Sequence, residues 1–124
     1  MAQLANVELT ISQSDSQRRL ALALLTYRYR LTCTDVEVER GVTFEISIDV
    51  LGEDPLRDEA LAERVDVHLV EASAEPVAVE RELLVGQSLL DEDIGRDEVK
   101  VRVRVGSDAG DVIDAVSGVV RGQF

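Results

Sequence analysis

Apolar and polar residues alternate along most of this chain. In several short runs every second residue is apolar, which is the period of a β-strand with one buried face. The clearest runs are Val7 to Ile11, Val36 to Val38, Phe44 to Val50, Val65 to Leu69 and Val99 to Val105. Valine is frequent in them, and β-branched side chains favour a pleated strand. The alternation therefore predicts an all-β fold, with the valines, leucines and isoleucines of each run facing the core.

Turn-forming residues separate the runs. Arg40-Gly41 predicts a tight hairpin between the second and third runs, and Gly52 to Pro55 predicts the end of the third. Further breaks fall at Ala74 to Pro76 and at Gly106 to Asp111. This spacing predicts an antiparallel β-sandwich of about seven or eight strands, immunoglobulin-like or of similar Greek-key architecture. The length suits one domain over residues 1–124.

Three segments depart from the alternation. Residues 56–64 are rich in Ala, Leu and Glu and could form one or two helical turns. Arg81 falls at an apolar position of the run over residues 77–85, which predicts a bulge or a strand end there. Residues 14–25 fit two structures. Ser14 and Gln17 resemble a helix capping box, whereas the alternation around Tyr27 favours a strand, so the strand is preferred and the helix stays open.

The stretch from Leu20 to Leu25 is apolar on both faces if it forms a strand. A sandwich strand buries one face in its own core, so the second set of side chains needs another cover. A symmetric dimer is the commonest closed solution. We therefore expect self-association, and the interface candidates are Leu20, Leu22, Leu24 and Leu25.

Charge excludes several classes of partner. The chain has 25 acidic and 13 basic residues, and its net charge of −12 repels nucleic acid and anionic membrane surfaces. No apolar run is long enough to span a membrane, and no secretory signal is recognisable, so a cytoplasmic location is expected. We expect the outward side chains of Lys100, Arg102 and Arg104 to face acidic neighbours within their own sheet.

The residues that carry most enzyme chemistry are scarce. There is one cysteine, Cys33, and one histidine, His68, so neither a disulfide framework nor a Cys/His zinc site fits one chain. The alternation places His68 beside Asp66 on the solvent face of its strand, which predicts a surface histidine rather than a catalytic base. No phosphate-binding loop is present, and no cofactor is expected.

One acidic segment resembles a calcium-binding loop. Asp91, Asp93 and Asp97 lie at nearly alternate positions around Gly95. Carboxylate oxygens at such spacing suit Ca²⁺, but Gly95 takes the place of the third ligand and Arg96 brings a repelling charge. A solvated turn is therefore the preferred interpretation, with a calcium site as the alternative.

These observations favour a non-enzymatic protein-interaction or assembly module that self-associates. Its expected partner is a second copy of the chain or another protein. Two alternatives stay open. One is a calcium-dependent binding module that uses the loop over residues 91–98. The other is a hydrolase that works with carboxylates alone, because acidic residues are abundant.

Overall fold

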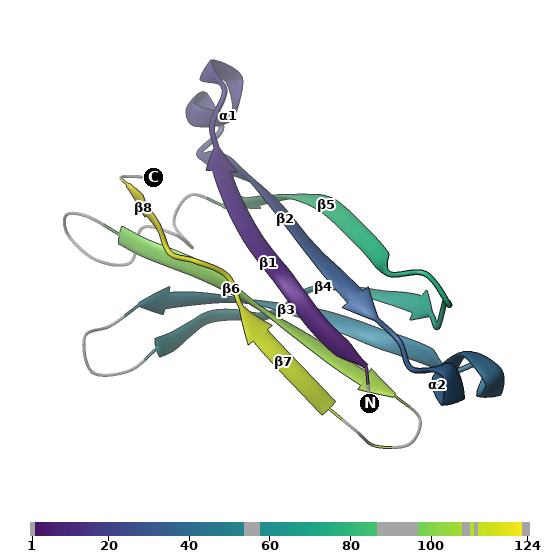
Figure 1. Ribbon diagram of the computed structural model, residues 1–124. Helices are drawn as coiled ribbons and strands as arrows, with labels where there is room; N and C mark the ends of the chain where they lie inside the picture. The colour runs from purple at the N-terminus through teal and green to yellow at the C-terminus, as the bar shows by residue number, and fades with distance from the viewer. Residues whose placement is uncertain (1, 54–57, 87–96, 108–109, 111, 123–124) are drawn as a thin grey trace.

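Two antiparallel β-sheets pack face to face. The computed structural model describes residues 2–53, 58–86, 97–107, 110 and 112–122. Sheet A has the strand order β1-β2-β5, and sheet B has the order β4-β3-β6-β7, with β8 also paired to β6 (Figure 1). The elements are β1 (Gln3–Ser12), α1 (Asp15–Arg19), β2 (Leu22–Thr32), α2 (Asp35–Arg40), β3 (Thr43–Glu53), β4 (Asp58–Glu71), β5 (Val77–Gly86), β6 (Asp97–Ser107), β7 (Val112–Val116) and β8 (Val120–Gly122). The predicted all-β fold, an antiparallel β-sandwich of about seven or eight strands, is confirmed.

The core lies between the central strands of the two sheets, as the alternation predicts. From sheet A, β2 contributes side chains such as Leu25 and Tyr27, both fully buried. From sheet B, β3 contributes Ile46 and Ile48, and β6 contributes Val99, Val101, Val103 and Val105. The predicted central strand Val99 to Val105 is thus confirmed, with its valines inward and its basic side chains on the opposite face.

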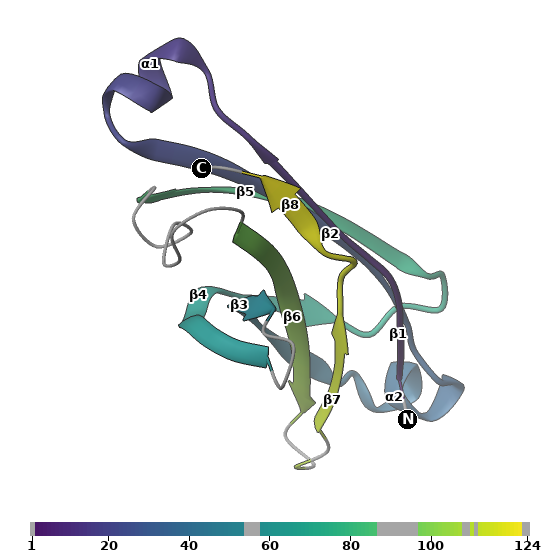
Figure 2. The same cartoon turned by 90° about the vertical axis from the view of Figure 1, so that its left-hand side faces the viewer.

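Both helices lie at the ends of sheet A and begin with capping boxes (Figure 2). At α1, the Ser14 side chain accepts from the backbone N–H of Gln17, and the Gln17 side chain accepts from the backbone N–H of Ser14. Residues 14–25 therefore combine both structures considered for them. Helix α1 comes first, and β2 begins at Leu22.

The predicted strand at Val36 to Val38 is wrong, because this segment is helix α2. Thr34 and Glu37 form its capping box, which satisfies backbone N–H groups at the first turn. The Arg40-Gly41 hairpin is wrong for the same reason. Gly41 is the C-cap, with a left-handed φ of 65°, so it ends a helix instead of turning a hairpin.

Strand β4 changes phase in its middle. The predicted helical turns at residues 56–64 are wrong where the chain is described, because β4 runs from Asp58 onward. Ile48 pairs with Asp66 and Val50 with Ala62, so residues 63–65 lie opposite the single residue Asp49. Arg64, within this bulge, has a left-handed φ of 51°. Beyond the bulge the even-numbered side chains turn inward.

The predicted phase of Val65 to Leu69 is therefore only partly right. Val65 packs against the core, but Val67 and Leu69 lie on the outside, with exposed fractions of 41% and 69%. Asp66 and His68 point inward instead, and their side chains are only 12% and 11% exposed. His68 is thus a largely buried histidine, and the predicted surface position is wrong.

Strand β5 pairs with β2 in unbroken register from Val77 to Gly86, so the bulge predicted near Arg81 is wrong. Arg81 keeps its inward phase because the Arg81 Nε donates to Oδ2 of Asp66 at 2.8 Å. Two charged residues at apolar positions therefore neutralise each other across the gap between β4 and β5.

Candidate functional site

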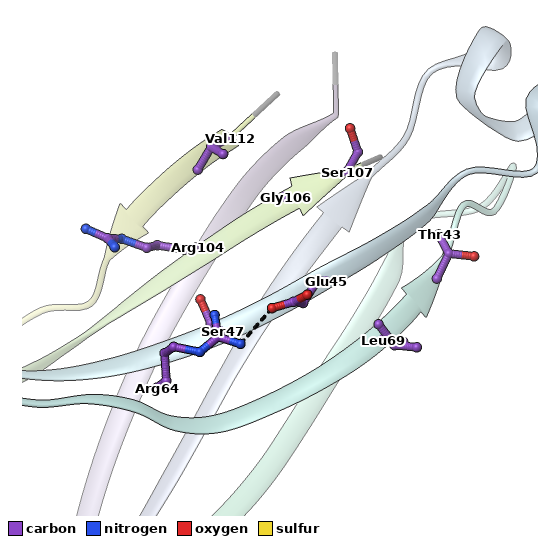
Figure 3. Close-up of a pocket in the computed structure, with 9 residues that line it drawn as sticks. All are labelled: Thr43, Glu45, Ser47, Arg64, Leu69, Arg104, Gly106, Ser107 and Val112. Carbon is purple, nitrogen blue, oxygen red and sulfur yellow. Dashed lines mark hydrogen bonds and ion pairs between the residues drawn. The ribbon is translucent and has the colours of Figure 1, made fainter. Parts of the chain in front are cut away.

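A hollow lies on the outer face of sheet B. Its volume is about 500 Å³, and it spans strands β4, β3, β6 and β7 (Figure 3). Gly106 has no side chain, and a Cβ placed on it would meet nothing within 4 Å. Arg64 and Arg104 line the hollow on its polar side, and Leu69 and Val112 line it on its apolar side. The hollow therefore combines cationic groups with apolar walls.

Asp49 organises the basic side chains of this face. Its side chain is 2% exposed, although it lies on the outward side of β3. Oδ2 accepts from Nη2 of Arg102 at 2.7 Å and from Nε of Arg102 at 3.0 Å, and it lies 3.6 Å from Nε of Arg104. Oδ1 accepts from the backbone N–H of Arg64 at 2.9 Å, which fixes the bulge of β4. The prediction that Arg102 and Arg104 face an acidic neighbour in the same sheet is confirmed.

The charge state of Asp49 follows from these contacts. Burial alone would raise the pKa of its carboxyl group. The hydrogen bonds from the Arg64 backbone and the Arg102 side chain, together with the positive charges, outweigh burial and leave the pKa of Asp49 below its usual value. Asp49 is therefore an ionised carboxylate that positions two arginines. A second acid of this face, Glu45, pairs with Nη2 of Arg64 at 2.8 Å (Figure 3).

Exposed apolar side chains gather around the hollow. Seven large apolar side chains of the described residues are exposed, and four of them lie on the outer face of sheet B. These four are Val67, Leu69, Val112 and Val116. The register places them on the two outer strands, β4 and β7, on either side of the charged residues of β3 and β6. The centre of this face is therefore charged and its two borders are apolar, and arginine is among the residues enriched at protein interfaces.

A second polar cluster lies between the sheets. The Tyr27 hydroxyl donates to Oδ2 of Asp66 at 2.5 Å, and a hydrogen bond of 2.6 Å joins the Tyr29 hydroxyl to Nε2 of His68. Nδ1 of His68 is buried without a hydrogen-bond partner and lies 3.8 Å from Oδ2 of Asp66. Tyr29, His68 and Asp66 thus follow the order of a nucleophile, a base and an orienting carboxylate.

The environment of this cluster does not suit catalysis. Tyr29 is 2% exposed, so a substrate would have to open the sandwich to reach its hydroxyl. Burial raises the pKa of Tyr29 well above its ordinary value, which disfavours the phenolate that would act as nucleophile. Burial, with the Arg81 charge, lowers the pKa of His68. The cluster is better explained as buried polar groups that hydrogen-bond to one another, with Nδ1 of His68 as the exception.

Two of the three candidate calcium ligands fall in the part of the chain that the structure does not describe. Asp91 and Asp93 lie outside the described residues, and Asp97 is described only as the first residue of β6. Among the residues that the structure describes, no three His, Cys, Asp or Glu side chains are grouped closely enough to hold a metal ion.

The four interface candidates fall into different environments. Leu25 is fully buried in the core, so a partner could not contact its side chain. Leu20 caps α1 and is 70% exposed. Leu22 and Leu24 are half-buried on the outer face of sheet A, and Leu24 pairs in register with the exposed Leu84. An interface at Leu20, Leu22 and Leu24 stays a prediction.

The alternation does not reveal the outer face of sheet B, because the bulge of β4 lets the consecutive residues Val65 and Asp66 both face inward. The sequence held only half of the signal. Arg81 falls at an apolar position of its run, but Asp66 falls at a polar position of the run from Val65 to Leu69, so nothing in the alternation turns Asp66 inward.

Comparisons with known proteins leave the function open. No family model matches the chain. No curated protein sequence matches it either. Similar solved structures include a Bordetella pertussis protein provisionally named ApaA, with 13% identity, a TM-score of 0.46, and coverage of 97% of this chain and 92% of that chain. Another is an X-ray structure of a structural-genomics target, with 8% identity, a TM-score of 0.44, and coverage of 99% and 86%. At these scores the likenesses carry no information on activity or partner.

Among the described residues, no helix is long and apolar enough to cross a membrane.

Proposed function

We propose that this chain is a non-enzymatic protein-interaction module that docks its partner on the outer face of sheet B. The observation that carries the proposal is the gathering of exposed Val67, Leu69, Val112 and Val116 around a hollow lined by arginines. Arginine is enriched where proteins meet, and exposed apolar side chains beside it can be buried by a partner.

The rigidity of the face supports the same function. The arginines are held by Asp49 and Glu45, so their positions are set before a partner arrives. A preorganised surface loses less side-chain entropy on binding than a mobile one. The face is also built on strands rather than on loops, which fixes the spacing of its side chains.

A hydrolase that uses carboxylates alone finds less support on this face. Such enzymes need one protonated and one ionised acid with separated pKa values. Here Glu45 and Asp49 are each paired with an arginine, and the pKa of Asp49 is lowered. Neither acid is placed to donate a proton.

Photo-cross-linking in the native host tests the proposal. A photoreactive amino acid replaces Val112 on β7, and in a control it replaces Glu82, which is exposed on the outer face of sheet A. We expect a protein adduct, identified by mass spectrometry, from position 112. Leu69→Glu on the same face should abolish that adduct. Adducts from position 82 alone, or none from position 112, would contradict the proposal.

A further inference from the structure

We propose that the partner on the outer face of sheet B is a second copy of this chain, docked face to face about a twofold axis that runs along the strands between β3 and β6. This inference rests on the proposed function, because it names the occupant of the same face. It is carried by the order of charges across the strands and by the register that aligns them.

The sign of charge alternates from strand to strand across this face. Arg64 on β4 is positive, and β3 carries the acids Glu45 and Asp49. Next, β6 carries Arg102 and Arg104, and β7 carries Asp114. Near the centre of the face the order is therefore positive, negative, positive, negative, and Glu71 adds an acid at the end of the β4 column. The apolar side chains occupy the two outer columns of the same four strands.

The register sets these residues in rows. One row crosses the sheet as Leu69, Glu45, Gly106 and Val112. The next crosses it as Val67, Ser47, Arg104 and Asp114. In a face-to-face dimer, each of these side chains therefore has a defined neighbour in the facing sheet.

A twofold axis parallel to the strands reverses the column order in the second copy. The acids of β3 then lie over the partner's β6 arginines, and Arg64 on β4 lies near the β7 column that carries Asp114. Within the rows, Leu69 then meets the partner's Val112 and Asp49 meets the partner's Arg102, while Val67 lies over the partner's Asp114. An axis across the strands would instead set acids on acids and arginines on arginines, which costs free energy. Charge complementarity selects the first arrangement.

The exposed arginines are suited to this shared role. Arg104 is 44% exposed and Arg64 is 58% exposed, so both keep hydrogen-bond donors toward a facing sheet. Each already has a carboxylate within its own chain, so dimerisation adds partners without leaving a charge unpaired. Aligned sheets pack about 10 Å apart, which leaves room for side chains from both faces.

The size of the face sets the strength of the dimer. Four strands about 4.8 Å apart, over roughly eight residues, give a face of about 500 Å², below the roughly 800 Å² per partner of stable complexes. The dimer is therefore expected to be weak and reversible, so it should be studied at high micromolar concentration.

Cysteine cross-linking tests the geometry directly. In a Cys33→Ala background, Leu69→Cys and Val112→Cys are made separately, mixed, and treated with a short bismaleimide. The proposed axis sets Leu69 of one copy over Val112 of the other, whereas two Leu69 side chains lie at opposite borders of the interface. We expect the mixed pair to cross-link at least tenfold more than either variant alone. Preferential Leu69→Cys homodimers would overturn the arrangement.

Sedimentation equilibrium with matched variants tests the face. Leu69 on β4 and Leu84 on β5 are 69% and 59% exposed, each on a border strand of its own sheet. Leu69→Glu should weaken dimerisation at least tenfold, while Leu84→Glu should leave it unchanged. The reverse result would place self-association on sheet A and overturn the inference. A strictly monomeric chain whose position-112 adduct is a different protein would overturn the second-copy inference alone. A monomer without any adduct would overturn the proposed function too.

Discussion

Replacing Asp49 tests how the outer face of sheet B is held together. The Asp49 carboxylate is almost completely buried and binds Arg102 through Oδ2 at 2.7 and 3.0 Å. Its other oxygen, Oδ1, accepts from the backbone N–H of Arg64 at 2.9 Å. Asp49→Ala removes both interactions. Asp49→Asn keeps an acceptor for the backbone N–H but removes the charge.

The expected cost can be worked from these contacts. Losing the acceptor of the Arg64 N–H should cost about 1–3 kcal/mol, because a donor in the bulge is left without its partner. Losing the charged hydrogen bonds to Arg102 should add about 1 kcal/mol, since this guanidinium is partly exposed and can turn to water. We therefore expect Asp49→Ala to lower the unfolding free energy by about 3 kcal/mol and Asp49→Asn by about 1–2 kcal/mol.

The pH dependence of the unfolding free energy tests the role of the Asp49 charge independently. The pKa of Asp49 is lower in the folded chain than in the unfolded chain. Its ionised form thus contributes stability that is fully present above the unfolded pKa of about 4 and is lost as pH falls through the folded pKa. The stability difference between the wild type and Asp49→Asn should stay constant from pH 7 to pH 5, roughly, and shrink below about pH 4.

Urea denaturation followed by circular dichroism measures both effects, at a protein concentration low enough to keep the chain monomeric. The denaturation midpoint should shift while the slope stays constant. Glu45→Ala is the matched control, because Glu45 lies on the same face of β3 and pairs with Arg64 but is 51% exposed. It should cost less than about 1 kcal/mol. If Asp49→Ala costs no more than Glu45→Ala, the organising role of Asp49 is refuted.

Three further predictions address the core and the cluster between the sheets. Val101→Asp places an unpaired charge where the side chain is fully buried, so it should lower the unfolding free energy by about 4 kcal/mol or more. A near-wild-type melting temperature would show that the position of Val101 is misassigned. Leu25→Glu should unfold the chain whereas Leu22→Glu should leave it folded, which thermal melts will show, and equal effects would contradict the two-sided assignment of β2. The only histidine, His68, should titrate in NMR with a midpoint below 6.5, the ordinary pKa of histidine. Its neutral form therefore contributes stability above pH 6.5, and this contribution is lost as the pH falls. A midpoint at or above 6.5 would contradict the burial of His68.

The sequence pattern predicts the central strands well and the border strands less well. Strands β3 and β6 are covered on their inner face by the other sheet, so each apolar side chain from Phe44 to Val50 and from Val99 to Val105 has one favourable side. Alternation is then a sufficient guide. The outer face of sheet B could not be predicted, because the β4 bulge depends on Asp49, fifteen residues before Arg64 in the chain.

Helix α2 shows a different kind of error. Val36 and Val38 alternate with acids, which favours a strand, yet the same residues lie between Thr34 and Gly41. A capping box at the start and a left-handed glycine at the end satisfy the free backbone groups of a short helix. Both signals were present in the sequence, and over six residues they outweigh a chance alternation.

The bulge of β4 couples the outer face of sheet B to the polar cluster between the sheets, so the two should be inherited together. A straight β4 that kept Val65 in the core would carry Val67 and Leu69 inward as well and would leave Asp66 and His68 in water. Descendants of this chain could then gain or lose the two features only together. Related sequences that replace Asp49 with an apolar residue should therefore also lack hydroxyl groups at the positions of Tyr27 and Tyr29, because those groups would have lost their partners on β4.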